Sequence, residues 1–293
     1  MKSSFSIKDL ENLSGIKAHT IRIWEKRYEL LAPERSETNI RTYDNTNLKR
    51  LLNVAYLNHS GVKISKLAGL TEKEISDQVQ DLILSGDNYD YSYNMFKLSM
   101  MNFDEILFNE TYNNLLQLHS FRDIFYNTFL KLLTEIGMLW QTNTIVTVHE
   151  HFISSLIKQK ILINTEKIQG IEKVVNKTFI LYLPFNEFHE LGLLFTHFEL
   201  TLKGYKVIYL GQSVPIEDLI ILQQSFDNLE YVSYITVEPS ANTINSYLKE
   251  FHEKIIAKNK SKLSIIGRNV EHYDNNIEGI TKFKELNHFL KEI

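Results

Sequence analysis

The chain has 293 residues, enough for two or three domains, and carries 32 Lys and Arg against 36 Asp and Glu, for a net charge of −4. It contains no cysteine, which excludes disulfides, thiolate metal sites and cysteine nucleophiles. No apolar run approaches the length of a membrane span and no secretory signal is evident. We therefore expect a cytoplasmic protein with no membrane partner.

Residues 1–50 differ from the rest of the chain in charge. They hold ten Lys and Arg against seven Asp and Glu, whereas the remaining residues hold 22 against 29. Only this amino-terminal region is suited to bind a polyanion. Its basic excess is small, and affinity for DNA rises with the number of phosphates neutralised. We therefore expect a homo-oligomer, either a dimer or a tetramer.

The same fifty residues predict a helix-turn-helix followed by a wing. Ser6 is placed to cap a first helix, and Gly15 supplies the bend before a second helix that turns Ile21 and Trp24 inward. Residues 33–44 follow as a hairpin-like wing. The side chains expected to contact double-stranded DNA are His19, Thr20, Arg22, Lys26, Arg27, Arg35, Arg41 and Tyr43.

This region resembles the MerR family of transcriptional regulators. The likeness rests on the run Ile21-Arg-Ile-Trp-Glu-Lys-Arg-Tyr-Glu-Leu-Leu, on Pro33 and Arg35, and on the wing sequence Asn39-Ile-Arg-Thr-Tyr. A generic arginine-rich helix pair is a weaker explanation, because here the turn glycine, the tryptophan-centred run and the wing occur together and in order. The resemblance implies a DNA-binding transcription factor.

The rest of the chain predicts a multidomain protein of α and α/β class. We expect a winged helix-turn-helix domain over residues 1–75, a linker over 76–92 and a four-helix bundle over 93–170, where apolar residues recur at helical spacing. From 171 to 293 short apolar strands alternate with helices, which predicts a doubly wound parallel sheet, Rossmann-like or flavodoxin-like. The expected strands are 178–183, 205–210, 231–237 and 263–266, and the expected helices are 188–203, 216–226, 240–259 and 283–292.

The loop after the first of these strands is the expected ligand-binding loop, because ligands of such sheets bind at the carboxyl ends of the strands. Its spacing of Glu187, His189 and Gly192 resembles the acid-x-His-x-x-Gly motif of cobalamin-binding domains. The resemblance implies that His189 ligates cobalt, Glu187 orients the other ring nitrogen and Gly192 leaves room for the nucleotide tail. Neutral imidazole is a good metal ligand, and a neighbouring carboxylate fixes its tautomer. The alternative is a loop histidine with no ligand.

A second motif lies in the helical segment, where nine residues separate Trp140 from Glu150 and His151. This spacing resembles that of the CarH-like cobalamin-dependent regulators, and it implies that these side chains cap the upper face of the corrin. Taken alone, Trp140 would be expected in the core of the bundle, and Glu150 and His151 would be expected on a solvent-exposed helix face. Found in order with the MerR-like region and the His189 loop, the resemblance covers nearly the whole chain and implies cobalamin as the cofactor. The further cofactor-binding residues that we expect are Ser233, Thr236 and Gly267.

Four residues depart from the cobalamin-binding pattern. Tyr234 and Ile235 stand near the place of a small hydroxyl residue, which predicts a narrowed tail pocket. Arg268 stands in place of a second glycine, where it would project into the tail slot or reach a phosphate. Gln141 stands where light-responsive members have a cobalt-capturing histidine. Because glutamine is a poor cobalt ligand, we expect illumination to form no stable bis-histidine adduct there.

These patterns together favour a DNA-binding repressor in which cobalamin controls oligomerisation and DNA binding. One alternative is a regulator with a degraded pocket that works without cobalamin, through a partner protein. Another is the corrinoid carrier of a methyltransferase, against which the DNA-binding region argues. The sequence also offers no further segment long enough for a catalytic domain, so we expect that the chain is not an enzyme.

Overall fold

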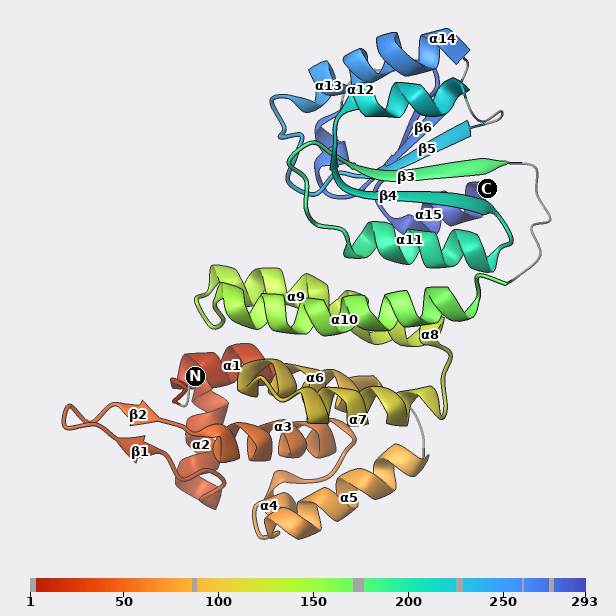
Figure 1. Ribbon diagram of the computed structural model, residues 1–293. Helices are drawn as coiled ribbons and strands as arrows, with labels where there is room; N and C mark the ends of the chain where they lie inside the picture. The colour runs from red at the N-terminus through yellow and green to blue at the C-terminus, as the bar shows by residue number, and fades with distance from the viewer. Residues whose placement is uncertain (1–3, 86–88, 171–176, 225–228, 260, 274–276) are drawn as a thin grey trace. The chain divides into compact units, whose positions relative to one another are not determined.

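The computed structural model describes residues 4–85, 89–170, 177–224, 229–259, 261–273 and 277–293 (Figure 1). Its contacts divide the chain into two compact units, Met1–Ile157 and Lys158–Ile293. Each unit has its own buried core, and they are described here as unit 1 and unit 2.

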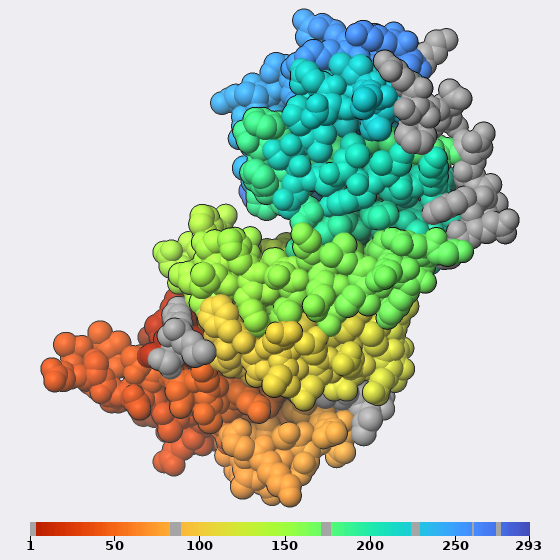
Figure 2. Space-filling model, in the orientation of Figure 1, coloured from red at the N-terminus to blue at the C-terminus, as the bar shows by residue number. Residues whose placement is uncertain are grey.

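Unit 1 begins with the predicted helix-turn-helix and wing. Its elements are α1 (Ile7–Ser14), α2 (Ala18–Tyr28), β1 (Glu34–Arg35), β2 (Arg41–Thr42), α3 (Asn45–His59), α4 (Ile64–Leu67) and α5 (Glu72–Ser85). Ser6 caps α1, Gly15 ends it with a φ of 75°, and Ile21 and Trp24 are buried, as expected. The antiparallel pair β1 and β2 forms a wing that projects from the body of unit 1, in orange-red in Figure 2.

The second half of unit 1 is the expected four-helix bundle. It consists of α6 (Tyr89–Asn102), α7 (Glu105–Leu116), α8 (Phe121–Ile124) continued by a π-helical turn into α9 (Leu130–Gln141), and α10 (Thr147–Lys167), whose last ten residues belong to unit 2. The core is aromatic, with the ring centroids of Phe96 and Phe129 5.2 Å apart and that of Phe108 4.9 Å from Phe96. Tilted ring pairs of this kind stabilise a core beyond the area that they bury.

The segment expected as a linker differs from the prediction. Residues 76–85 continue α5, α6 begins at Tyr89, and only 86–88 lie outside the described residues. Ile75 and Val79 are buried one helical turn apart, so an apolar stripe extends the helix through the polar residues 76–78 and 80–81. The DNA-binding region and the bundle belong to one compact unit rather than to two.

Two polar contacts join α1 of the helix-turn-helix to the bundle. The Lys97 ammonium donates to the Leu13 carbonyl at 2.6 Å and lies 3.5 Å from a Glu135 carboxylate oxygen, while Asn12 donates to the Thr144 hydroxyl at 2.8 Å. Lys97 is only 4% exposed, and burial lowers its pKa to about 8. Burial also raises the pKa of Glu135 to about 7. An ammonium buried in this way needs its acceptors, so the two halves of unit 1 are fixed to each other.

Unit 2 is the predicted doubly wound α/β domain. Its remaining elements are β3 (Thr178–Pro184), α11 (Leu191–Leu202), β4 (Lys206–Val214), α12 (Ile216–Leu219), β5 (Leu229–Tyr234), α13 (Ile244–Phe251), α14 (Ala257–Asn259), β6 (Lys262–Ile266), β7 (Ile280–Phe283) and α15 (Leu286–Glu292). The five strands are parallel in the order β4-β3-β5-β6-β7. Helices α11 and α15 cover one face of the sheet, and α12 to α14 cover the other (Figure 1). The sequence did not predict β7, a four-residue strand at the sheet edge.

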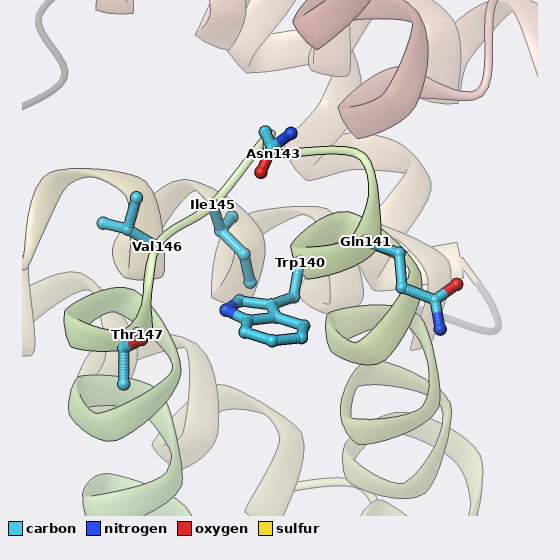
Figure 3. Close-up of a pocket in the computed structure, with 6 residues that line it drawn as sticks. All are labelled: Trp140, Gln141, Asn143, Ile145, Val146 and Thr147. Carbon is cyan, nitrogen blue, oxygen red and sulfur yellow. The ribbon is translucent and has the colours of Figure 1, made fainter.

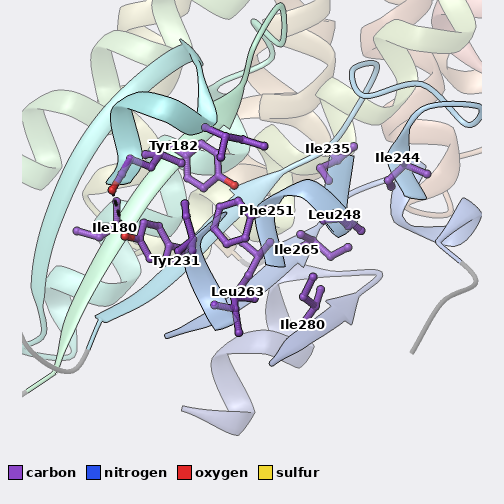
Figure 4. Close-up of a cluster of buried hydrophobic side chains, with 14 of the residues drawn as sticks. Ile180, Tyr182, Tyr231, Ile235, Ile244, Leu248, Phe251, Leu263, Ile265 and Ile280 are labelled. Carbon is purple, nitrogen blue, oxygen red and sulfur yellow. Dashed lines mark hydrogen bonds between the residues drawn. The ribbon is translucent and has the colours of Figure 1, made fainter. Parts of the chain in front are cut away.

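The core on the α13 side extends to the carboxyl ends of the strands (Figure 4). Tyr182 stacks on Phe251 with their ring centroids 6.0 Å apart, and its hydroxyl lies 2.8 Å from that of Tyr247. The strand order reverses between β3 and β5, which is where doubly wound folds bind ligands. Across the described ranges of both units, we find no helix with the length and apolarity that a membrane span requires.

We predict that Lys97→Met lowers the free energy of unfolding of unit 1 by about 1–3 kcal/mol, because the Leu13 carbonyl loses its buried donor. Glu135 can take up a proton once the ammonium is gone, so the carbonyl accounts for most of the loss. Both tryptophans of the chain, Trp24 and Trp140, lie in unit 1, and their fluorescence during urea unfolding measures this unit alone. Lys131→Met, at an exposed position of α9, is the control and should change stability by less than about 0.5 kcal/mol. Equal losses in the two variants would contradict the role given to Lys97.

Candidate functional site

The recognition helix α2 presents a basic outer face. His19, Arg22, Lys26 and Arg27 are exposed along it, and Thr20 is half-buried. In the wing, the exposed Arg35 donates to the Asn39 side chain at 2.6 Å. These side chains lie on the surface that a helix-turn-helix offers to DNA, so the geometry is compatible with their predicted role.

Glu25 fixes the wing to the recognition helix. The Arg41 guanidinium donates to one of its carboxylate oxygens at 3.0 Å, and the Tyr43 hydroxyl donates to the other. Tyr43 is 1% exposed, and burial together with Glu25 raises its pKa. The expectation that Tyr43 contacts phosphate is therefore wrong, because its hydroxyl is committed inside the domain. Sequence inspection missed Glu25, which stands in a run of charged residues with nothing to distinguish it.

A hollow of about 290 Å³ lies where α9 ends and α10 begins, with the indole of Trp140 inside the turn (Figure 3). It is lined by Trp140, Gln141, Asn143, Ile145, Val146 and Thr147. Trp140 is 55% exposed, which is unusual for the largest apolar side chain and excludes the alternative that it is bundle core. The lining is mixed, with Trp140, Ile145 and Val146 as its apolar part and Gln141, Asn143 and Thr147 as its polar part.

The other two residues of the tryptophan motif lie outside the lining of this hollow. Glu150 is half-buried and His151 is exposed, both in the first turns of α10. The neighbouring His149 is buried instead, where its ring stacks on Phe103 at 4.8 Å and its Nδ1 accepts the Val146 backbone N–H at 3.2 Å. His149 thus stabilises the start of α10, beside the hollow.

In unit 2, the carboxylate of Glu187 joins the loops that follow β3 and β5. One oxygen accepts the backbone N–H groups of Phe188 at 2.9 Å and His189 at 3.0 Å, and the His189 Nδ1 lies 2.6 Å from it. The other oxygen accepts the N–H groups of Thr236, Val237 and Glu238 at 3.0, 2.6 and 2.9 Å. A fully buried carboxylate thus receives five backbone hydrogen bonds and faces one imidazole nitrogen.

This arrangement sets the charge of Glu187 and the orientation of His189. Burial by itself raises the pKa of the Glu187 carboxyl, but the hydrogen bonds from His189 and the backbone outweigh it and hold the pKa at about 2. The ionised carboxylate favours a proton on Nδ1 of His189, so Nε2 becomes the nitrogen suited to a metal. The His189 side chain is 51% exposed. Phe185, Phe188 and Val237, on the same two loops, are 60%, 58% and 51% exposed, an apolar surface around the histidine.

Gly192 lies where the motif requires it, but the space that it leaves is filled. A Cβ atom at this position would lie 2.5 Å from the ring of Tyr234. The predicted residue Ser233 is fully buried, and the predicted Thr236 contributes its backbone N–H to Glu187. Among the residues that depart from the cobalamin-binding pattern, Ile235 is fully buried and Arg268 is exposed. The residues present therefore fit a metal ligand at His189 and disagree with a nucleotide tail inserted beside Gly192.

Gly267 is required by the backbone rather than by an open slot. Its φ is 123°, and a Cβ there would lie 2.7 Å from the Ile235 carbonyl oxygen. Neighbouring contacts come from Asn269, whose side chain donates to the Val237 carbonyl at 2.9 Å. Gly267 and Asn269 thus support the loop after β5 from the side opposite Glu187.

Comparison with known proteins identifies two segments of the chain. Residues 5–74 match the model of the MerR HTH family regulatory protein, and residues 93–163 match that of the B12 binding domain. The chain has the domains of a MerR-type DNA-binding regulator that carries a B12-binding domain. It is 24% identical to the HTH-type transcriptional repressor CarH of Myxococcus xanthus, over 82% of this chain and 83% of that protein. It is also 24% identical to the repressor CarA of the same organism, over 71% of this chain and 68% of that protein.

A solved structure shares the fold of the bundle and the α/β domain. It is the monomethylamine corrinoid protein of Methanosarcina barkeri, with a TM-score of 0.58 and 12% identity, over 70% of this chain and 98% of that one. At this identity the likeness concerns the fold alone. The expected order of a helical domain followed by a doubly wound domain is confirmed.

We predict that Glu187→Gln lowers the local opening free energy of the loop after β5 by about 2 kcal/mol or more at pH 7, because a neutral amide cannot accept five backbone donors. The pKa of Glu187 is depressed from 4.5 to about 2, so its contribution is complete above pH 4.5 and is lost as the pH falls towards 2. Hydrogen exchange of the amides of residues 236–238, corrected for intrinsic rates, measures the effect. The difference from the parent should shrink between pH 4.5 and pH 2.

The matched control is Glu253→Gln, a surface carboxylate of the same unit with 62% side-chain exposure. It should leave exchange of residues 236–238 unchanged at both pH values. If Glu187→Gln behaved like this control, the buried carboxylate would not be what holds the two loops together.

Proposed function

We propose that this chain is a transcriptional repressor that binds a DNA operator as a homo-oligomer, and that a corrinoid bound through His189 controls its DNA affinity. The observation that carries the proposal is the Glu187–His189 pair at the topological switch point of the sheet. A fixed, half-exposed imidazole with Nδ1 on a buried carboxylate and Nε2 outward is the arrangement of a metal-binding histidine.

The loops that carry Glu187 and His189 expose apolar side chains that suit a large apolar ring system. Phe185 and Phe188, on the loop that carries His189, and Val237, on the loop after β5, are exposed apolar side chains. His189 would hold a corrinoid, which would supply a cobalt ion as the metal for the histidine nitrogen. In the neutral ring, Glu187 would hold the proton on Nδ1 and so would leave Nε2 as the nitrogen for the metal, while the exposed apolar side chains would limit water around the ring.

The contact between Asn12 and Thr144 supports a route from the hollow to DNA. Thr144 is fully buried in the turn that lines the hollow, and Asn12 lies in α1 of the helix-turn-helix. A ligand that changes this turn therefore changes a direct contact of the DNA-binding domain. Control of DNA binding then requires only that the ligand binds more tightly to one of two conformations of this turn.

The Tyr234 ring over Gly192 favours a second candidate function. With that room filled, the same regulator would work without a corrinoid, and a partner protein would control it. The corrinoid titration below separates the two candidates, because a regulator that binds no corrinoid would cause no change in the absorption spectrum of added cobinamide.

We predict that cobinamide, a corrinoid without the nucleotide tail, shifts its absorption bands to those of a nitrogen-ligated cobalt ion when added to the protein. His189→Ala should abolish the shift and weaken binding by about tenfold or more, as loss of a metal ligand or its support does. His288→Ala, an exposed histidine on α15, is the matched control and should keep both. An unchanged spectrum in His189→Ala would remove this residue from the site, and absence of any binding by the parent would favour the regulator without corrinoid.

A further inference from the structure

Tyr234 closes the space directly beside the candidate metal ligand. It is the last residue of β5, and a Cβ at Gly192 would lie 2.5, 2.8 and 2.9 Å from its Cε1, Cζ and Cδ1 atoms. Three atoms of one ring at nearly equal distances mean that the ring lies over the Gly192 backbone. The space that the missing side chain leaves at Gly192 is therefore filled by the Tyr234 ring of the protein itself.

The ring is held in this position by α11. The Thr196 hydroxyl donates to the Gly192 carbonyl at 2.8 Å, and the Tyr234 phenol interacts with the same threonine side chain. Thr196 is fully buried, so water does not replace these contacts readily. Tyr234 thus lies against the first turn of α11, and moving it costs the packing of its ring over Gly192.

The position matters because of the shape of cobalamin. Its lower base is tethered to the same face of the corrin that a histidine would approach. When His189 takes the lower cobalt position, the displaced base and its nucleotide loop remain on the protein side and need room beside the histidine. Gly192 is three residues from His189, at the start of α11, and the room there is occupied by Tyr234.

We propose that Tyr234 is a specificity-determining residue that makes the site selective for corrinoids without a bulky lower base. This inference rests on the proposed function, since it needs a corrinoid at His189. The class of ligand is an incomplete corrinoid of the cobinamide type, in which nothing competes with Tyr234 for the space beside Gly192. A complete cobalamin must displace the ring from the space beside Gly192.

The test compares two ligands and three proteins. Equilibrium dissociation constants of cobinamide and hydroxocobalamin are measured by absorption titration with the parent, Tyr234→Ala and Tyr234→Phe. We expect the parent to bind cobinamide about tenfold or more tightly than hydroxocobalamin, the size of effect seen when an extra group is forced into a packed site. Tyr234→Ala should reduce this preference at least tenfold by improving cobalamin binding, whereas Tyr234→Phe, which keeps the ring, should retain most of it.

The outcomes separate this inference from the proposed function. Two results would overturn the role of Tyr234 without contradicting the corrinoid site. One is that the parent binds hydroxocobalamin more tightly than cobinamide. The other is that the parent and a Tyr234→Ala protein with a native circular dichroism spectrum show the same preference between the two ligands. Failure of the parent to bind cobinamide overturns both, because Tyr234 cannot obstruct a ligand that has no tail. If Tyr234→Ala does not fold, Tyr234→Ser and the preference of the parent decide the question by the same criteria.

Discussion

A buried carboxylate controls the geometry of each half of this molecule. Glu187 has no exposed surface, yet five backbone N–H groups and one imidazole nitrogen converge on its two oxygens. An ionised group can be buried only when its hydrogen bonds replace the water that it loses. The loops after β3 and β5 must therefore adopt the conformation that supplies these donors, and that conformation also orients His189.

Glu25 serves the DNA-binding region in a similar way. Through Arg41 and Tyr43 it fixes the wing against the recognition helix, so that the two DNA-facing elements move as one body. The buried Lys97 and the Asn12–Thr144 contact extend this rigidity from α1 into the bundle. Unit 1 is thus suited to transmit a change at the α9–α10 turn to the helix-turn-helix, because packed elements respond by discrete shifts rather than by gradual deformation.

Local patterns in the sequence were sufficient for much of this account. The cap at Ser6, the bend at Gly15, the inward Ile21 and Trp24 and the His189 loop were all predicted, because each depends on residues a few positions apart. What the sequence did not predict depends on partners far along the chain. The commitment of Tyr43 to Glu25 is one such case, and the ring of Tyr234 over Gly192 and the contact of Asn12 with Thr144 are others. The helix over residues 76–85 was missed because the polar, glycine-containing patch that begins at Ser85 was extended back over it.

The central claim is that occupation of the His189 site changes the affinity for DNA. The direct measurement is the dissociation constant, by fluorescence anisotropy, for a duplex that the parent selects from a random-sequence pool, with and without saturating cobinamide. The account predicts a change of about fivefold or more in the parent, the usual range for coupled sites, and none in His189→Ala. Arg22→Ala should lose the preference for the selected duplex over other sequences, with or without the ligand. Equal dissociation constants in the parent with and without bound corrinoid would contradict the account.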